Sequence, residues 1–150
     1  MGMNKDEYYL GIARAVAMKS TCLRKHYGAI IVKDDRILST GYNGAPVGEE
    51  HCCICTKIKS NKDVEEYLSC VSVHAEQNSI IQAARKDMLC STLYLAGINP
   101  ASGAEMSVVK PCQICLRLIK NAGIDKVITR QGIIYKRNPL TNILEEILVD

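Results

Sequence analysis

Two short motifs constrain this chain more than any other feature, because together they supply three metal-ligand side chains and a carboxylate. The first is His74-Ala75-Glu76, and the second is Pro111-Cys112-Gln113-Ile114-Cys115, whose first cysteine follows His74 by 38 positions. Imidazole and thiolates are typical zinc ligands. A structural zinc usually has four protein ligands, whereas a catalytic zinc keeps one position open for water. The set therefore indicates a catalytic metal centre with Glu76 beside it.

Both motifs are expected to open helices. Cys112 and Cys115 are one helical turn apart and so face the same way, and Pro111 suits the first position of a helix. A helix N-terminus favours negative charge and lowers the pKa of a thiol, which suits a metal ligand. His74 is expected to begin a helix over residues 74–86, with Glu76 close enough to reach a water on the metal.

Either motif by itself is ambiguous. Cys-x-x-Cys could be a redox pair or half of a structural zinc knuckle, and a lone His-x-Glu means little. In this order the two motifs match the signature of zinc-dependent nucleobase deaminases. Thioredoxin-like chemistry would require neither His74 nor Glu76.

Length and composition predict a single domain over residues 1–150 with one core. The chain is 47% apolar and 23% charged, as in soluble globular proteins, and its net charge of +3 is too small to indicate nucleic-acid binding. Seven tyrosines are the only large aromatic residues, since Trp and Phe are absent. Neither a signal peptide nor a membrane span is recognisable, so we expect a cytoplasmic protein without a membrane partner.

The order of predicted elements indicates a central sheet covered by helices. An amphipathic helix is expected from Tyr9 to near Ser20, and a hairpin from strands at 29–32 and 36–40. Further strands are expected at 92–96 and 126–129, with 133–135 as a short fifth strand. A helical stripe is predicted at the C-terminus from Leu140, Ile143, Leu144, Ile147 and Leu148. Residues 47–72 are interpreted as an irregular cysteine-rich insertion whose lysines (Lys57, Lys59 and Lys62) form a solvated face.

With these motifs in order, the chain resembles the deoxycytidylate (dCMP) deaminase family of the cytidine deaminase superfamily over roughly residues 7–130. The motifs beginning at His74 and Pro111 belong to the whole superfamily. Two others point to the deoxycytidylate branch: Ser20-Thr21-Cys22-Leu23-Arg24, and Gly41-Tyr42-Asn43-Gly44 followed by Pro46 and Gly48. The resemblance implies an α/β fold of three α/β/α layers, with a central mixed sheet of about five strands.

The same resemblance implies zinc-dependent hydrolysis of dCMP to dUMP and ammonia, which feeds dTMP synthesis. Zinc held by His74, Cys112 and Cys115 would lower the pKa of a water from about 16 toward about 7. Glu76 would take the proton of that water and return protons to N3 and to the departing ammonia during attack at C4.

Four substrate contacts are also implied by the resemblance, at Asn43, Ala75, Ser20 and Arg24. Asn43 would bind a sugar hydroxyl or a base edge, with a turn-forming Asn before Gly as the alternative. Ser20 and Arg24 are candidates for the 5′-phosphate, because an arginine fork matches phosphate geometry. An exposed, solvated Arg24 is the alternative.

One departure from the family pattern concerns base stacking. The resemblance leads us to expect a base-stacking tyrosine at position 129 or 130, where this chain has Thr129 and Arg130. Tyr135 is the candidate substitute.

A second metal centre is a further hypothesis, because many members of the family carry an additional structural zinc near this insertion. The chain has eight cysteines, which a cytoplasmic protein would keep reduced. From a set that also includes His51 and Cys53, we place this zinc on Cys22, Cys52, Cys55 and Cys70. Plain buried thiols are the alternative.

The resemblance also implies a homohexamer that is activated by dCTP with magnesium and inhibited by dTTP. Arg85 resembles a family position near subunit contacts, although a surface arginine accounts for it equally well. Other functions stay open: a deaminase of another cytosine nucleotide or nucleoside, a tRNA adenosine deaminase, or a non-catalytic zinc-binding protein. The weak charge and the absence of Trp and Phe disfavour a nucleic-acid substrate, and Glu76 disfavours a purely structural zinc.

Overall fold

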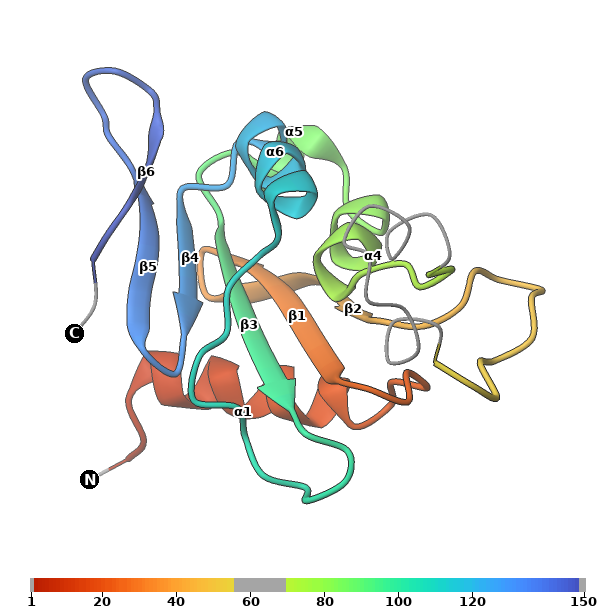
Figure 1. The fold of residues 1–150 in the computed structure, drawn as a ribbon. Coiled ribbons are helices and arrows are strands. Elements are labelled where there is room, and N and C mark those ends of the chain that lie inside the picture. Colours follow the sequence, from red (N-terminus) through yellow and green to blue (C-terminus); the bar gives the residue numbers. More distant parts are fainter. Residues whose placement is uncertain (1, 56–69, 149–150) are drawn as a thin grey trace.

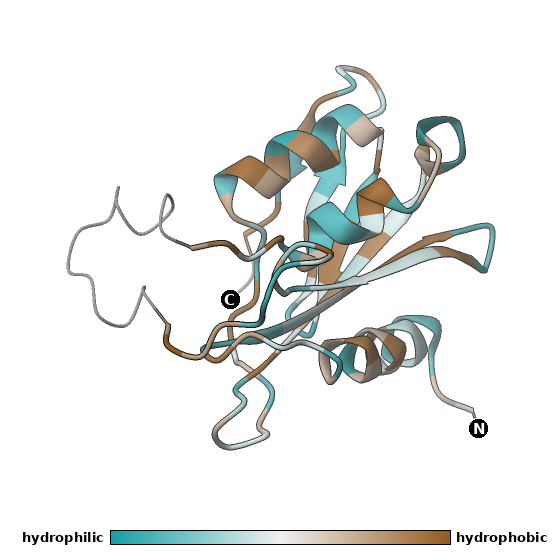
Figure 2. Cartoon of the chain, turned by 90° about the vertical axis from the view of Figure 1, so that its right-hand side faces the viewer, coloured by the Kyte–Doolittle hydropathy of each residue, from teal (hydrophilic) through white to brown (hydrophobic). Residues whose placement is uncertain are grey.

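The computed structural model describes residues 2–55 and 70–148, which form a six-stranded sheet between two layers of helices (Figure 1). Figure 2, turned by 90°, shows helix α1 (Lys5–Ala17) on one side of the sheet and helices α4 (Ala75–Ile81) and α6 (Gln113–Ala122) on the other. This arrangement confirms the predicted three-layer α/β/α architecture, with six strands instead of about five. Among the helices of the described part, none combines the length and apolar character needed to cross a membrane.

The sheet is mixed, with the strand order β2-β1-β3-β4-β5-β6. Only β3 and β4 pair in parallel, because helix α6 connects them as a crossover, and the other neighbours are antiparallel. The strand bounds are β1 His26–Lys33, β2 Arg36–Tyr42, β3 Thr92–Ile98, β4 Lys126–Thr129, β5 Gly132–Arg137 and β6 Leu144–Glu146.

The hairpin between β1 and β2 confirms the predicted turn. Asp34 and Asp35 both have positive φ, 51° and 59°, as a two-residue type I′ turn requires. Strand β2 continues through Gly41 and Tyr42, two residues beyond the strand predicted at 36–40.

Helix α1 (Lys5–Ala17) covers one face of the sheet. The Asn4 side chain caps it by accepting a hydrogen bond from the Glu7 N–H at 2.9 Å. Its buried side chains pack with alternate residues of β1 and β3, such as Ile30 and Tyr94. The odd-numbered residues of β1, including Ala29 and Ile31, face the opposite core beneath α4 and α6.

Helix α4 (Ala75–Ile81) lies directly on β2, because Gly41 has no side chain. A Cβ at Gly41 would lie 2.4 Å from the Ala75 carbonyl oxygen and 2.4 Å from the Ser79 nitrogen. The Ser39 hydroxyl also donates to the Ser79 carbonyl at 2.7 Å. These contacts fix the start of α4, which carries the first metal-ligand motif.

The single helix predicted over residues 74–86 is wrong in its extent. Helix α4 ends at Ile81, and the chain turns before the short helix α5 (Arg85–Met88). The third helix of this layer, α6 (Gln113–Ala122), ends at Gly123, whose φ of 79° forms a left-handed C-cap.

The predicted C-terminal helix is also wrong, because residues 144–146 form strand β6 along the open edge of β5. The Asn138 side chain accepts hydrogen bonds from the N–H groups of Leu140 and Thr141, and Asn142 has a φ of 61°, so the segment forms a turn. Of the predicted stripe, Leu144 is buried, whereas Leu140 is 94% exposed. A short helix that packs poorly against the rest of the protein is only marginally stable. As a strand, the segment instead makes backbone hydrogen bonds to the otherwise unpaired edge of β5.

Candidate functional site

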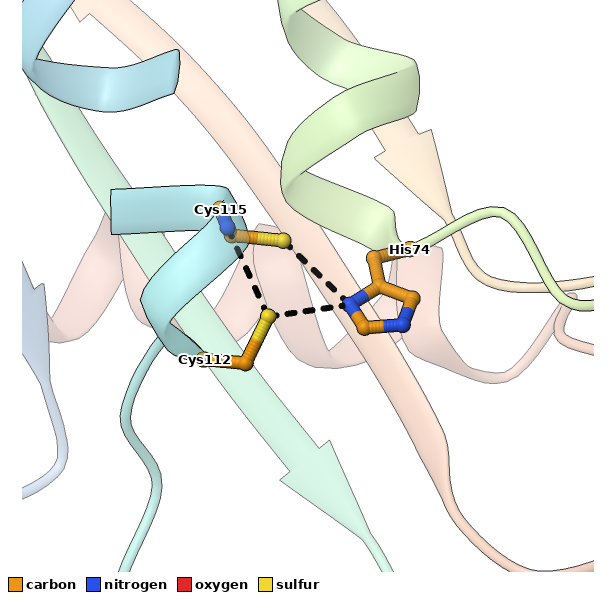
Figure 3. Close-up of side chains that lie close together, drawn as sticks. All are labelled: His74, Cys112 and Cys115. Carbon is orange, nitrogen blue, oxygen red and sulfur yellow. Dashed lines mark hydrogen bonds between the residues drawn. The ribbon is translucent and has the colours of Figure 1, made fainter. Parts of the chain in front are cut away.

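The three predicted metal ligands converge at the N-termini of two neighbouring helices (Figure 3). Nδ1 of His74 lies 3.6 Å from Sγ of Cys112 and 3.2 Å from Sγ of Cys115. The ligand atoms of all three side chains lie within 4.8 Å of one another. No fourth His, Cys, Asp or Glu of residues 2–55 and 70–148 joins this group.

Local hydrogen bonds hold both motifs in position. His74 is the N-cap of α4, and its N–H donates to Oε1 of Gln77 at 2.8 Å. Cys112 is the N-cap of α6, and its Sγ accepts from the Cys115 N–H at 3.4 Å. Pro111 therefore precedes the N-cap and does not occupy the first helical position that we predicted. The thiols nevertheless lie at a helix N-terminus, as expected.

The geometry of this cluster fits a zinc ion. Tetrahedral zinc with Zn–S of about 2.3 Å and Zn–N of about 2.0–2.1 Å holds sulfur and nitrogen about 3.5 Å apart. The two observed separations, 3.6 and 3.2 Å, bracket this value. Three protein ligands would leave a fourth position for water, which is the arrangement of catalytic zinc sites.

The two thiols differ in acidity. The pKa of Cys112 is lowered to about 3, chiefly because its sulfur accepts a hydrogen bond from the Cys115 thiol, with further bonds from His74 and the Cys115 backbone. The pKa of Cys115 is raised, because its proton is held by Cys112 and because the thiol is buried. A divalent cation bound by both sulfurs would displace the proton of the less acidic thiol.

Glu76 lies in the first turn of α4 and is only 5% exposed. Burial raises the pKa of its carboxyl group, while a backbone hydrogen bond and the electrostatic effect of His74 oppose that shift. A carboxyl group whose pKa is raised by burial is suited to accept and return a proton. The acid is therefore inside the site and not in bulk solvent.

A cavity of about 170 Å³ lies in front of the cluster. Besides His74, Glu76 and Cys112, its lining includes the predicted residues Asn43 and Arg24. The sequence analysis missed four lining residues, namely Lys25, Tyr27, Ser72 and Lys110. Lys110 could have been found, since it directly precedes Pro111, but Tyr27 carried no sequence signal of its own. Arg24, Lys25 and Lys110 are cations, and Glu76 is the one carboxylate that residues 2–55 and 70–148 contribute to this lining.

Asn43 is buried at the wall of this cavity and joins three segments of the chain. Its Oδ1 accepts hydrogen bonds from the Ser20 hydroxyl at 2.6 Å and from the Tyr27 N–H at 2.8 Å. Its Nδ2 donates to the Lys25 carbonyl at 2.9 Å. An amide group has two N–H donors, so one stays available to a ligand. These long-range bonds go beyond the role of a turn-forming Asn.

The other predicted substrate contacts occupy different environments. Arg24 is exposed at the cavity. Ser20 is not among the lining residues, and its hydroxyl instead bonds to Asn43, which gives it a positioning role. The Ala75 side chain is fully buried in the core at the first position of α4, where the backbone N–H has no partner within the helix.

The prediction that Tyr135 takes over the base-stacking role expected at position 129 or 130 is wrong. Tyr135 is 6% exposed and packs in the core beneath α6, on strand β5. Thr129 is also buried, and Arg130 donates to the Glu105 carbonyl. None of these three residues is among those that line the cavity.

The four cysteines proposed for a second metal surround another cavity of about 170 Å³. Cys22, Cys52, Cys55 and Cys70 all line it. Cys52 is exposed, and the pKa of its thiol is raised by partial desolvation and by the neighbouring thiols. Within the described residues these sulfurs do not form a group of three inside 4.8 Å. Cys53 is exposed and does not line this cavity. Lys57, Lys59 and Lys62 lie outside the described residues.

Comparisons with known proteins agree with the geometry. A family model described as the cytidine and deoxycytidylate deaminase zinc-binding region matches residues 3–131. The chain is 40% identical over 129 residues to the deoxycytidylate deaminase of Mycobacterium phage D29, covering 82% of this chain and 91% of that protein. It is 32% identical over 145 residues to ComE operon protein 2 of Bacillus subtilis, covering 94% of this chain and 66% of that protein.

A solved structure shares the fold. The dCMP deaminase from the cyanophage S-TIM5, in complex with dCMP and dUMP, aligns with a TM-score of 0.61 and 28% sequence identity. The alignment covers 85% of this chain and 83% of that one.

Proposed function

This chain belongs to the cytidine and deoxycytidylate deaminase zinc-binding family, and we propose that its reaction is the hydrolytic deamination of dCMP to dUMP and ammonia. The observation that carries the proposal is the His74, Cys112 and Cys115 cluster with buried Glu76 in the same cavity. A structural zinc site has no use for such a carboxylate, which argues against a non-catalytic zinc-binding protein.

The chemistry divides between the metal and Glu76. A bound zinc supplies a Lewis acid that makes a water nucleophilic near neutral pH. Glu76 accepts a proton from the attacking water and delivers protons to N3 and to the leaving amino group. A C–O bond forms at C4 as the C4–N4 bond breaks, so that water is consumed and ammonia is released.

The charge of the cavity supports a nucleotide substrate. Among the described residues that line it, three cations, Arg24, Lys25 and Lys110, oppose the single carboxylate of Glu76. An arginine fork or a lysine ammonium binds a phosphate well, so we assign the 5′-phosphate to this cationic side. The binding of dCMP and dUMP by the cyanophage enzyme supports the same substrate class.

Asn43 and Ala75 are proposed to orient the nucleoside part. The second N–H of the Asn43 amide would donate to a sugar hydroxyl or a base edge, and the Ala75 backbone N–H would donate to the base. Ser20 would act through Asn43, because its hydroxyl holds the Asn43 oxygen.

A second, structural zinc on Cys22, Cys52, Cys55 and Cys70 stays a prediction. Their common cavity supports it, although zinc would have to draw the sulfurs into a tighter group. Metal quantitation on the purified protein tests it, and one zinc per chain would eliminate the second site.

Four further properties stay predictions from the family resemblance. They are the homohexamer, regulation by dCTP with magnesium and by dTTP, the organisation as a single domain, and the cytoplasmic location. Sedimentation with and without each triphosphate tests the first two.

An ammonia-release screen tests the proposed reaction. The substrates are dCMP, CMP, dCTP, deoxycytidine, their methylated forms and a tRNA anticodon stem-loop, each with and without dCTP or dTTP. We expect the highest kcat/KM for dCMP. A preference for deoxycytidine would remove the phosphate from recognition, and activity on the stem-loop alone would replace the proposal with a nucleic-acid deaminase.

A further inference from the structure

The cavity beside the metal cluster has one aromatic wall. Tyr27 is the only aromatic side chain among the described residues that line it, and the other lining residues are polar, charged or thiols. Tyr9 and Tyr94 pack together on the α1 face, Tyr135 is in the core, and Tyr8 is exposed on α1. Within the described part of the lining, a planar pyrimidine that enters this cavity therefore meets one complementary aromatic face, that of Tyr27.

The ring of Tyr27 is held by the sheet. Tyr27 pairs with Gly97 across β1 and β3, and it lies on the same face of β1 as the core beneath α4 and α6. A Cβ at Gly97 would lie 3.0 Å from the Tyr27 ring and 2.3 Å from the terminal methyl of Met106. The ring thus lies over Gly97 with Met106 nearby, and a side chain at position 97 would occupy space next to the ring.

Tyr27 is also tied to the loop that carries the predicted nucleoside contact. Its N–H donates to Oδ1 of Asn43 at 2.8 Å. Glu76 and Cys112 lie near enough for their negative charges to add to the effect of burial in raising the pKa of the Tyr27 hydroxyl. The phenol ring thus lines the same cavity as Glu76, the acid that must reach N3 and C4 of the base.

We propose that Tyr27 is a substrate-binding residue whose ring packs against the pyrimidine of the bound nucleotide. This inference rests on the proposed deamination of a cytosine nucleotide. It assigns base stacking to the first residues of β1, on a different element from positions 129 and 130, where Thr129 is buried and Arg130 points to another partner.

Steady-state kinetics with dCMP test the role of the ring. Tyr27→Phe keeps the aromatic face, so its KM should equal that of the wild type. Tyr27→Leu keeps apolar bulk without the face, and its KM should rise roughly 5- to 150-fold with little change in kcat. Tyr8→Leu, at an exposed tyrosine of α1, is the matched control and should keep both constants. An unchanged KM in Tyr27→Leu would overturn the proposal.

A fluorescence titration tests the same contact without turnover. The chain has no tryptophan, so Tyr27→Trp combined with Glu76→Gln gives a single tryptophan, which can be excited selectively over the tyrosines, in a zinc-loaded protein that should not consume dCMP. Saturating dCMP should quench its emission, whereas deoxyribose 5-phosphate, which lacks the base, should not. Tyr8→Trp in the same background should respond to neither. Unchanged emission while equilibrium dialysis records bound dCMP would overturn the proposal, even if Tyr27→Leu fails to fold.

The two proposals fail in different ways. A wild-type protein that releases no ammonia from dCMP contradicts the proposed function, while quenching by dCMP would still support stacking on Tyr27. Normal deamination with an unaltered KM in Tyr27→Leu contradicts the stacking alone. Failure of dCMP to bind contradicts both.

Discussion

Replacing Glu76 with glutamine should abolish turnover while the protein keeps its zinc. Glutamine has nearly the same shape but cannot accept a proton from water or deliver one to N3 or the leaving amine. General acid–base catalysis is worth roughly 10²- to 10⁴-fold. Glu76 performs more than one transfer, and no other carboxylate is among the described residues that line the cavity. We therefore expect a loss near the upper end, about 5 kcal/mol in activation free energy.

The assay follows ammonia release from dCMP with zinc content measured on the same samples. Glu146→Gln on the edge strand β6 makes the same chemical change far from the cluster and should leave kcat unchanged. Because burial raises the pKa of Glu76, its ionised form costs stability above the pKa of the unfolded chain, and metal-free Glu76→Gln should melt no lower than the metal-free wild type. A fully zinc-loaded variant with near-normal kcat would remove Glu76 from the mechanism.

Three further predictions concern packing, pH and metal binding. Gly41→Ala should lower the free energy of unfolding by about 1–3 kcal/mol and reduce zinc occupancy, because the added Cβ meets the backbone of α4. Gly11→Ala inside α1 is the control and should raise the free energy of unfolding by about 0.5–1 kcal/mol. Urea denaturation with metal analysis measures both variants, and a change of the same sign in the two unfolding free energies would contradict this prediction. The hydrogen bond from Tyr9 to Asp35 raises the pKa of Tyr9 to about 12. Its contribution to the free energy of unfolding should therefore be complete below pH 10 and disappear as the pH rises from 10 to 12. Tyr9→Phe should lower the free energy of unfolding by about 1 kcal/mol at neutral pH, and an equal decrease in Tyr8→Phe would refute this. Zinc binding to the metal-free protein should release a proton from the buried cysteine ligand, Cys115, so the affinity for zinc should rise with pH. Isothermal titration calorimetry in several buffers tests this. A binding enthalpy that does not depend on the ionisation enthalpy of the buffer would disprove the proton release.

The sequence alone identified the candidate metal ligands. The side-chain types of His74, Cys112 and Cys115 can be read directly, and two cysteines one turn apart at a helix start must face the same way. The β1–β2 hairpin was predicted for the same reason, because two aspartates between apolar runs specify a tight turn.

Other features were decided by contacts between residues far apart in the chain. The stripe around Leu144 has helical spacing, but the open edge of β5 offered backbone partners, and the segment became a strand. Tyr27 had no motif to identify it, and it reaches the cavity only because Gly97, some 70 residues later on β3, leaves room for its ring. Short-range patterns specify which groups can bind a metal, whereas the shape of the space around that metal depends on which strands and helices pack together, and only the folded chain determines this.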